Sequence, residues 1–124
     1  MPKKSDPARK IALDIVQAAR AKKALGLVVL DMRKVSGFCD YFVIASGTSN
    51  RQVNAIAQGI QEDLAEQGIK SLSKASPSDE SGWAVLDFIS VIVHIFYKPM
   101  REFYSLESLW RDAKKVKIPS SRKK

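Results

Sequence analysis

Apolar residues recur at helical spacing in two segments of the chain and at strand spacing in several others. Spacing of three and four residues predicts an amphipathic helix that begins at Asp6-Pro7 and ends near Lys22-Lys23. Proline is favoured at the first helical position, and lysines are favoured near a helix C-terminus. A second helix of the same kind follows Ser49, and we expect it to end at Gly68.

Short apolar runs separated by turn residues predict β-strands. Four such runs cover residues 27–30, 39–46, 83–88 and 91–97, and the last two are close enough to form a hairpin. We expect a short edge strand near residues 70–73 and a final helix around residues 105–113. The order α-β-β-α-β-β-β-α predicts an α/β (α+β) fold, in which helices pack on a mixed five-stranded sheet.

The chain has 124 residues and a net charge of +8, which is concentrated at its two ends. Residues 1–10 carry +3 and residues 114–124 carry +6, which leaves −1 for the body. We therefore expect a basic tail in residues 1–7, one folded domain in residues 8–115 and a disordered basic tail in residues 116–124. A neutral body argues against a folded surface built to hold a nucleic-acid duplex. The C-terminal lysines still suit weak, salt-sensitive contact with RNA phosphates, and the candidates are Lys114, Lys115 and Lys117.

Several functional classes receive no support from the composition. No apolar run approaches the roughly 18 residues of a membrane span, and the basic N-terminus lacks the apolar stretch of a signal peptide. The single cysteine, Cys39, cannot form an internal disulfide, and no Cys/His cluster has the spacing of a metal site. We expect a cytoplasmic protein with no metal ion and no cofactor.

The segment DYFVIASGTSNRQV, residues 40–53, predicts a strand that turns sharply into a helix. Ser49 and Gln52 have the spacing of a capping box. The Gly47–Asn50 turn could instead bind phosphate through amides at the helix start, as in a nucleotidyl- or phosphotransferase. Such an enzyme needs neighbouring carboxylates to hold magnesium, and Asp87 has no second acid at short strand spacing. The segment is better interpreted as a structural corner, with the enzyme as the alternative.

No catalytic residue stands out elsewhere. The single histidine, His94, lies in the middle of an apolar strand, where a structural or interface role is commoner than a role as a base. Cys39 adjoins Asp40, whose negative charge raises the pKa of a thiol and makes it a poor nucleophile. We therefore expect a binding protein more than an enzyme.

The C-terminal half contains large aromatic residues with a polar atom, which often serve as anchors in protein interfaces. Trp83 opens a strand and Tyr104 precedes the expected final helix, so both rings lie at the ends of elements. Such positions favour partial exposure. The alternative is that these rings belong to the core.

Four motifs in the same order make this chain resemble the ribosomal silencing factor family, also called the Iojap or RsfS family. The motifs are DYFVIASGTSNRQV, GWAVLDF, VIVHIFY and REFYSLESLW, and the resemblance covers residues 8 to about 113. It implies a nucleotidyltransferase-like core without the catalytic carboxylates. The family's partner-contacting positions fall on Trp83 and Tyr104. Weaker candidates in the same motifs are Asp87, His94, Arg101, Leu106 and Trp110.

The resemblance implies a translational repressor. Members of this family bind the fourteenth protein of the large ribosomal subunit and block joining of the small subunit, and organellar members are tied to large-subunit assembly. A homodimer of the free protein is a further expectation, because an open sheet edge or an apolar docking face favours self-pairing. A plain nucleic-acid binder remains a third class.

Two positions depart from the family pattern. Ser76-Pro77 stands where members commonly have Glu-Gly, and Ile89-Ser90 stands where they commonly have Gly-Asp between the last two long strands. A tight hairpin turn requires φ > 0, which a β-branched isoleucine resists. We therefore expect a different or wider turn at Ile89-Ser90.

Overall fold

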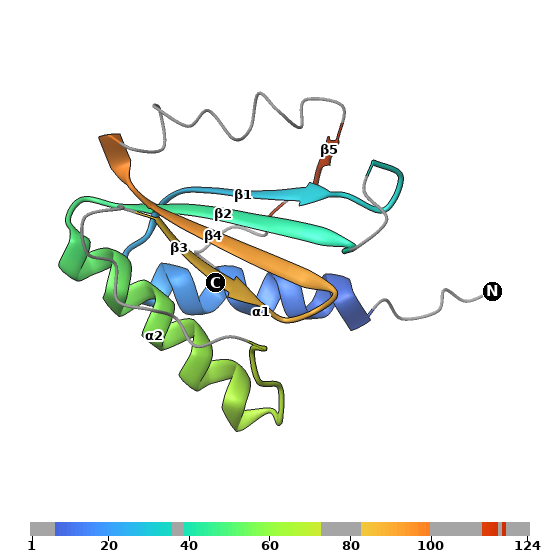
Figure 1. Ribbon diagram of the computed structural model, residues 1–124, viewed down its shortest axis with the longest axis horizontal. Coiled ribbons are helices and arrows are strands. Elements are labelled where there is room, and N and C mark those ends of the chain that lie inside the picture. The colour runs from blue at the N-terminus through green and yellow to red at the C-terminus, as the bar shows by residue number, and fades with distance from the viewer. Residues whose placement is uncertain (1–6, 36–38, 73–82, 100–112, 117, 119–124) are drawn as a thin grey trace.

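The computed structural model describes residues 7–35, 39–72, 83–99, 113–116 and 118, which form two helices and one sheet (Figure 1). The elements in chain order are α1 (Pro7–Ala21), β1 (Leu25–Asp31), β2 (Tyr41–Gly47), α2 (Asn50–Glu66), β3 (Trp83–Asp87), β4 (Val91–Tyr97) and β5 (Lys114–Lys115). The mixed fold and the two helices agree with the pattern of apolar residues.

The sheet has five strands in the order β3-β4-β2-β1-β5. β2 and β4 are parallel, whereas the β1–β2, β3–β4 and β1–β5 pairs are antiparallel. The predicted mixed five-stranded sheet and the β3–β4 hairpin are therefore confirmed. β3 and β5 form the two edges, so the ends of the sheet differ in sequence and in charge.

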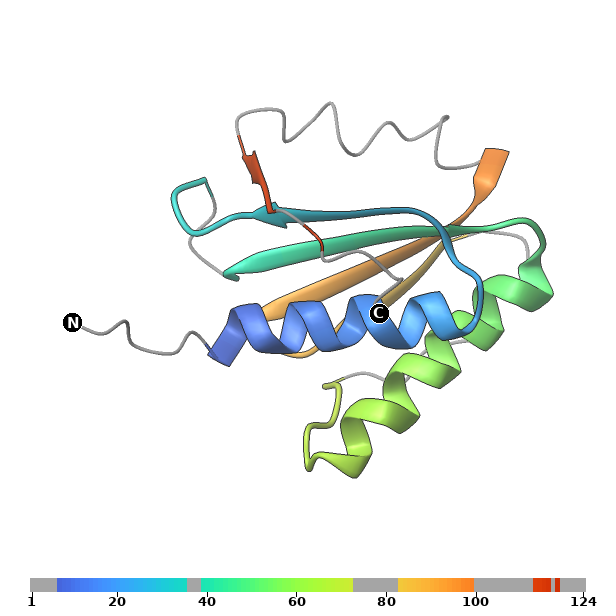
Figure 2. The same cartoon turned by 180° about the vertical axis from the view of Figure 1, so that it is seen from behind.

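Both helices cover the same face of the sheet (Figures 1 and 2). Their apolar sides and the inward residues of the strands form the main core, in which Ile15, Tyr41, Ile56 and Ile95 are fully buried. A fully buried side chain of this size contributes about 1.5–3 kcal/mol to folding. The side chains on the helical side of the sheet therefore stabilise the fold and are not available to a partner.

The two helices end in the same hydrogen-bonded arrangement. At the end of α2, the Gly68 N–H donates to Ala65 O and the Ile69 N–H donates to Leu64 O, both at 2.9 Å, with Gly68 at φ 81°. These bonds form a Schellman motif and confirm the predicted stop at Gly68. The end of α1 has the equivalent pair of bonds, with Lys23 at φ 65° in the position that favours glycine.

The fifth strand is not where the sequence predicted it. Lys70 to Leu72 are not in a strand, although the Leu72 N–H reaches β3 and donates to Asp87 O at 2.7 Å. Leu72 is 67% exposed, so no burial supports a strand there. The fifth strand is β5, where Lys114 pairs with Asp31 and Lys115 with Leu30. Short, lysine-bearing strands are common at sheet edges because they discourage further pairing.

The turn between β3 and β4 is different from a primed hairpin turn, as one of the two expectations had it, but it is tight and not wider. The Phe88 N–H donates to Val91 O, and the Ser90 N–H donates to Phe88 O, both at 2.9 Å. The second bond closes a γ-turn centred on Ile89, which has φ 74°. The expectation that isoleucine would avoid positive φ is therefore wrong. The Ile89 N–H is held by Asp87 Oδ1 at 2.8 Å, which helps to fix this conformation.

The described part of the C-terminal segment packs on the folded body. The Val116 N–H donates to Val29 O at 2.8 Å, and Val116 and Ile118 contact the main core. Both residues belong to the segment 116–124, for which the charge pattern predicts a basic tail. The final helix expected over residues 105–113 lies outside the described residues except for Ala113, which is buried and not helical.

Candidate functional site

The face of the sheet opposite the helices, which we call the outer face, carries side chains from four strands. The strand pairings arrange them in rows across the sheet. The rows are Trp83–Phe96, Val85–His94–Ile44–Val28 and Asp87–Ile92–Phe42–Leu30. Leu30, Phe42, Ile44 and Phe96 are buried in a second apolar cluster, separate from the main core. Because side chains alternate along a strand, the outer face brings Trp83, Asp87 and His94 together.

Trp83 is held in a defined orientation by two neighbours on β4. Its indole Nε1 donates a hydrogen bond to His94 Nδ1 at 3.3 Å, and its ring stacks on Phe96 with centroids 5.2 Å apart. The residue is half-buried at the start of β3. This position agrees with the prediction of a partly exposed ring at the end of an element.

His94 lies beneath the outer face, with only 8% of its surface exposed. The His94 ring makes a T-shaped contact with the Phe42 ring, with centroids 4.7 Å apart. Burial lowers the pKa of His94 to about 4, so the ring is neutral at physiological pH. Because Nδ1 accepts from Trp83, the proton of the neutral ring is assigned to Nε2, which has no hydrogen-bond partner among the described residues. His94 therefore supports the orientation of Trp83.

The open part of the outer face lies along β3. Val85 is 39% exposed and follows Trp83 on the same side of the strand. The nearby Ile89 and Leu72 are 64% and 67% exposed, and each contacts Asp87 through a hydrogen bond to its own N–H. Single exposed apolar residues are ordinary on a protein surface, but three of them follow this edge strand. We call Leu72, Val85 and Ile89 the β3 edge patch.

Other predicted site residues are not on this face or are not described. Lys114 and Lys115 are exposed in β5, at the opposite edge of the sheet from β3. The residues that lie outside the described part are Arg101, Tyr104, Leu106, Trp110 and Lys117.

The corner after β2 forms much as the sequence predicted. Ser49 caps α2, because its Oγ accepts from the Gln52 N–H at 3.1 Å. The Gln52 side chain binds one residue earlier than in a capping box, with Oε1 accepting from the Thr48 N–H at 2.6 Å. Its Nε2 donates to the carbonyl groups of Lys22 and Lys23, and thereby ties the start of α2 to the end of α1.

These contacts leave the corner poorly suited to phosphate. The N–H groups of Thr48, Gln52 and Val53 are all bonded within the turn. A Cβ atom on Gly47 would lie 3.1 Å from the Val53 nitrogen, so the close approach of strand and helix favours glycine here. Among the described residues, no three His, Cys, Asp or Glu side chains are grouped to hold a metal ion.

Cys39 also fails to form a nucleophilic site. It is buried, and desolvation raises its pKa to about 11, with smaller contributions from the charges of Asp40 and Asp87. The predicted effect of Asp40 on the thiol is therefore confirmed, although burial is the larger cause.

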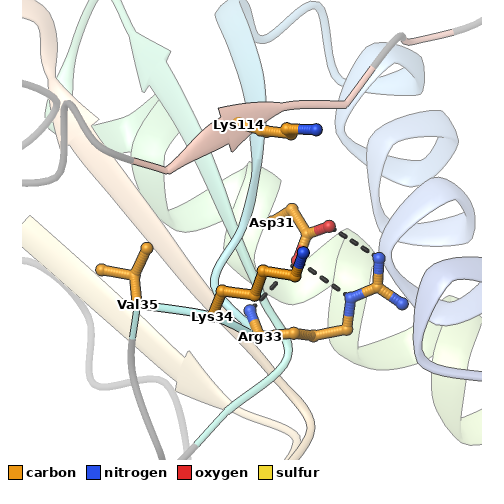
Figure 3. Close-up of a pocket in the computed structure, with 5 residues that line it drawn as sticks. All are labelled: Asp31, Arg33, Lys34, Val35 and Lys114. Atoms are coloured by element: carbon orange, nitrogen blue, oxygen red, sulfur yellow. Dashed lines mark hydrogen bonds and ion pairs between the residues drawn. The ribbon is translucent and has the colours of Figure 1, made fainter.

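A small pocket that the sequence did not indicate lies at the other edge of the sheet (Figure 3). It has a volume of about 190 Å³ and is lined by Asp31, Arg33, Lys34, Val35 and Lys114. Arg33 binds both carboxylate oxygens of Asp31, with Nε–Oδ1 at 2.9 Å and Nη2–Oδ2 at 2.7 Å. Hydrogen bonding from Arg33 lowers the pKa of Asp31, so this acid is ionised.

Comparison with known proteins identifies the family. A family model described as "Ribosomal silencing factor during starvation" matches residues 5–124. A Bacillus subtilis protein named Ribosomal silencing factor RsfS is 42% identical over 92 residues, covering 74% of this chain and 77% of that protein. The chain belongs to the RsfS family of ribosomal silencing factors. The family match extends beyond the four motifs and includes the basic C-terminal segment, which the sequence resemblance had left out.

Structural and more distant relatives agree with this RsfS assignment. A crystal structure of a Chromobacterium violaceum protein aligns with a TM-score of 0.78 at 28% identity, covering 90% of this chain and 89% of the other. A mouse protein named Mitochondrial assembly of ribosomal large subunit protein 1 is 31% identical over 98 residues, which is 77% of this chain and 43% of that protein. The RsfS family is regulatory and associated with ribosomes. Within the described residues, neither helix has the length and apolar character needed to cross a bilayer.

Proposed function

We propose that this RsfS-family chain binds the fourteenth protein of the large ribosomal subunit through the outer face of β3 and β4. The bound domain would then exclude the small subunit by its bulk and repress translation. Family membership supports the ribosome as the target. The observation that supports this particular surface is Trp83, which His94 and Phe96 hold in a fixed orientation beside the exposed Val85.

Physical considerations favour this face over the helical face. An aromatic side chain that is already oriented loses little conformational entropy on binding, so more of its contact energy contributes to affinity. Interface anchors of this kind are worth about 2 kcal/mol or more. Val85, which is exposed and lies two residues along β3 on the same side, would help to exclude water around the ring.

The finer parts of the proposal follow from the same surface. Tyr104, Arg101, Leu106 and Trp110 are proposed to contribute to the docking surface with Trp83, and Asp87 to contribute at its edge. The same apolar surface would support a homodimer of the free protein, in competition with ribosome binding. We propose the cytoplasm as the site of action, and a nucleotidyltransferase-like ancestry for the fold.

A charge introduced on the β3 edge patch should weaken binding to large subunits. Val85→Glu places a carboxylate that would have to be desolvated at the interface, and we expect at least a thirtyfold loss, equivalent to about 2 kcal/mol. Trp83→Ala and Tyr104→Ala should each have a comparable effect. Co-sedimentation of each variant with purified large subunits measures the loss.

Leu25→Glu provides the matched control. Leu25 is 40% exposed, against 39% for Val85, but it lies on β1 with β2 and β4 between it and β3. It should bind like wild type. Equal binding by Val85→Glu, Trp83→Ala and wild type would show that the chain does not dock through this face.

The nucleotidyl- or phosphotransferase alternative has less support, because the Gly47–Asn50 turn uses its own side chains to satisfy N–H groups that a phosphate would need. Isothermal titration with a nucleotide and magnesium tests it directly. Arg51 is an exposed cation directly after this turn, so nucleotide binding that is weakened by Arg51→Ala would favour the enzyme over the docking protein.

A further inference from the structure

We propose that the pocket at the β1–β5 edge binds the phosphate backbone of RNA, through Lys34 and Lys114. This inference deepens the proposed function and rests on it, because docking on a ribosome would bring RNA beside the protein. The sequence suggested RNA contact by the C-terminal lysines only. The structure places one of them, Lys114, across a pocket from a lysine of the β1–β2 connection.

The charges of the pocket are unevenly distributed among its lining residues. Asp31 and Arg33 neutralise each other through two side-chain bonds, and the Arg33 N–H also donates to Asp31 Oδ1 at 3.0 Å. Neither Lys34 nor Lys114 has a hydrogen bond or ion pair with another described residue. The five lining residues therefore carry two cations in excess, although the charge of Lys114 also acts on Asp31 within the pocket.

The backbone on both sides of the pocket is held by hydrogen bonds. Lys114 is fixed by its pairing with Asp31 in β5, and the Asp31–Arg33 bonds brace the backbone that leads to Lys34. Figure 3 shows Lys114 on one side of Asp31 and the backbone of Arg33 and Lys34 on the other. Two lysines on a braced framework lose less entropy on binding phosphate than the same residues in a free tail.

Further charged residues lie at the same end of the molecule as the pocket. The start of α1, with Arg9 and Lys10, lies at the same end of the molecule as β5 and the end of β1 (Figures 1 and 2). Lys115 adds a further exposed cation in β5. The acids Asp40 and Asp87 are also at this end, where their charges raise the pKa of Cys39. A chain of phosphates, with charges repeated along its length, matches these separated cations better than a single anion does.

The expected consequence is a smaller salt dependence of ribosome binding in Lys34→Ala/Lys114→Ala. Each phosphate contact contributes about 0.7–0.9 to the slope of log K against log salt, so the double variant should lower the slope by about 1.5. Large-subunit binding is measured between about 50 and 200 mM KCl. Lys22→Ala/Lys70→Ala is the matched control, because it removes the same charge from exposed lysines outside the pocket and should retain the wild-type slope.

A second binding assay uses a fluorescently labelled RNA hairpin and separates this inference from the proposed docking. Lys34→Ala/Lys114→Ala should weaken hairpin binding, whereas Val85→Glu should leave it unchanged. A wild-type slope and wild-type hairpin affinity in the lysine variant would overturn the pocket and leave the docking face standing. If the wild-type protein binds the hairpin but does not bind large subunits, the proposed docking would be overturned and the RNA pocket would stand.

The hairpin assay also tests the class of ligand. Excess inorganic phosphate at constant ionic strength should leave the hairpin bound, because one phosphate ion cannot replace several linked phosphates. Displacement of the hairpin by inorganic phosphate would identify a single-anion site and overturn the assignment to RNA.

Discussion

At the scale of single residues, the Trp83–His94 pair links the exposed docking face to the buried cluster beneath it. The hydrogen bond from Trp83 Nε1 requires a neutral His94, since a protonated Nδ1 is a donor and cannot accept. Burial maintains that state by lowering the histidine pKa to about 4. The same pair therefore makes the orientation of the proposed anchor dependent on pH.

The stability of the protein should fall as the pH is lowered from about 6.5 to about 4. His94 has a lower pKa in the folded state than in the unfolded chain, where it is near 6.5, so the unfolded state binds the proton more readily in this range. The loss should approach about 3 kcal/mol at the acid end, from 1.36 kcal/mol for each pH unit between the two pKa values. Urea unfolding at a series of pH values measures it.

His94→Asn is the control for this titration. Its side-chain oxygen can still accept from Trp83 Nε1, but it does not titrate, and the carboxyl groups that titrate in the same range are common to both proteins. The difference between the two proteins in the pH dependence of the free energy of unfolding gives the contribution of His94. A wild-type pH profile in His94→Asn would show that His94 is not the group responsible.

At the scale of elements, the corner between β2 and α2 fixes how the helical layer meets the sheet. Gln52 makes four hydrogen bonds there: its Oε1 accepts from the N–H and Oγ1 of Thr48, and its Nε2 donates to the carbonyls of Lys22 and Lys23. One side chain thus satisfies groups at the start of α2 and at the end of α1. The corner is a structural joint between the helices.

Gln52→Ala should lower the free energy of unfolding by about 1–2 kcal/mol, because it leaves several backbone groups without their partners. Gln58→Ala on the same helix removes only an exposed bond to Glu62, worth about 0.2–0.5 kcal/mol. Chemical denaturation compares the two variants. Equal stability of Gln52→Ala and Gln58→Ala would contradict a joining role for this corner.

The elements that sequence reasoning located are those with a local signal. Periodicity found both helices and the strands β1 to β4, and side-chain chemistry found the Ser49 cap and the Gly68 stop. β5 has no such signal, since two lysines show no apolar alternation and pair with β1 only because distant parts of the chain meet. The positive φ of Ile89 was not predicted, because hydrogen bonds made by neighbouring residues outweigh the intrinsic preference of isoleucine against this conformation.

At the scale of the whole molecule, the two edges of the sheet differ in chemistry. The β3 edge is apolar, with Val85 and Ile89 exposed, whereas the β5 edge is basic, with Lys114 and Lys115 exposed. Sequence analysis marked Trp83 as a candidate anchor, but its contact with His94 depends on the β3–β4 register. The basic pocket could not be foreseen, because Lys34 and Lys114 are far apart in the chain. We propose that the apolar edge binds protein while the basic edge binds RNA.

Site-specific photo-crosslinking tests the proposed docking face most directly. Benzoylphenylalanine is placed at Val85 in one protein and at the equally exposed Leu25 in another, and each is bound to purified large subunits before irradiation. The account predicts that position 85 forms an adduct with one large-subunit protein, the fourteenth, and that position 25 does not. Adducts from position 25 alone, or equal labelling from both positions, would contradict docking through β3.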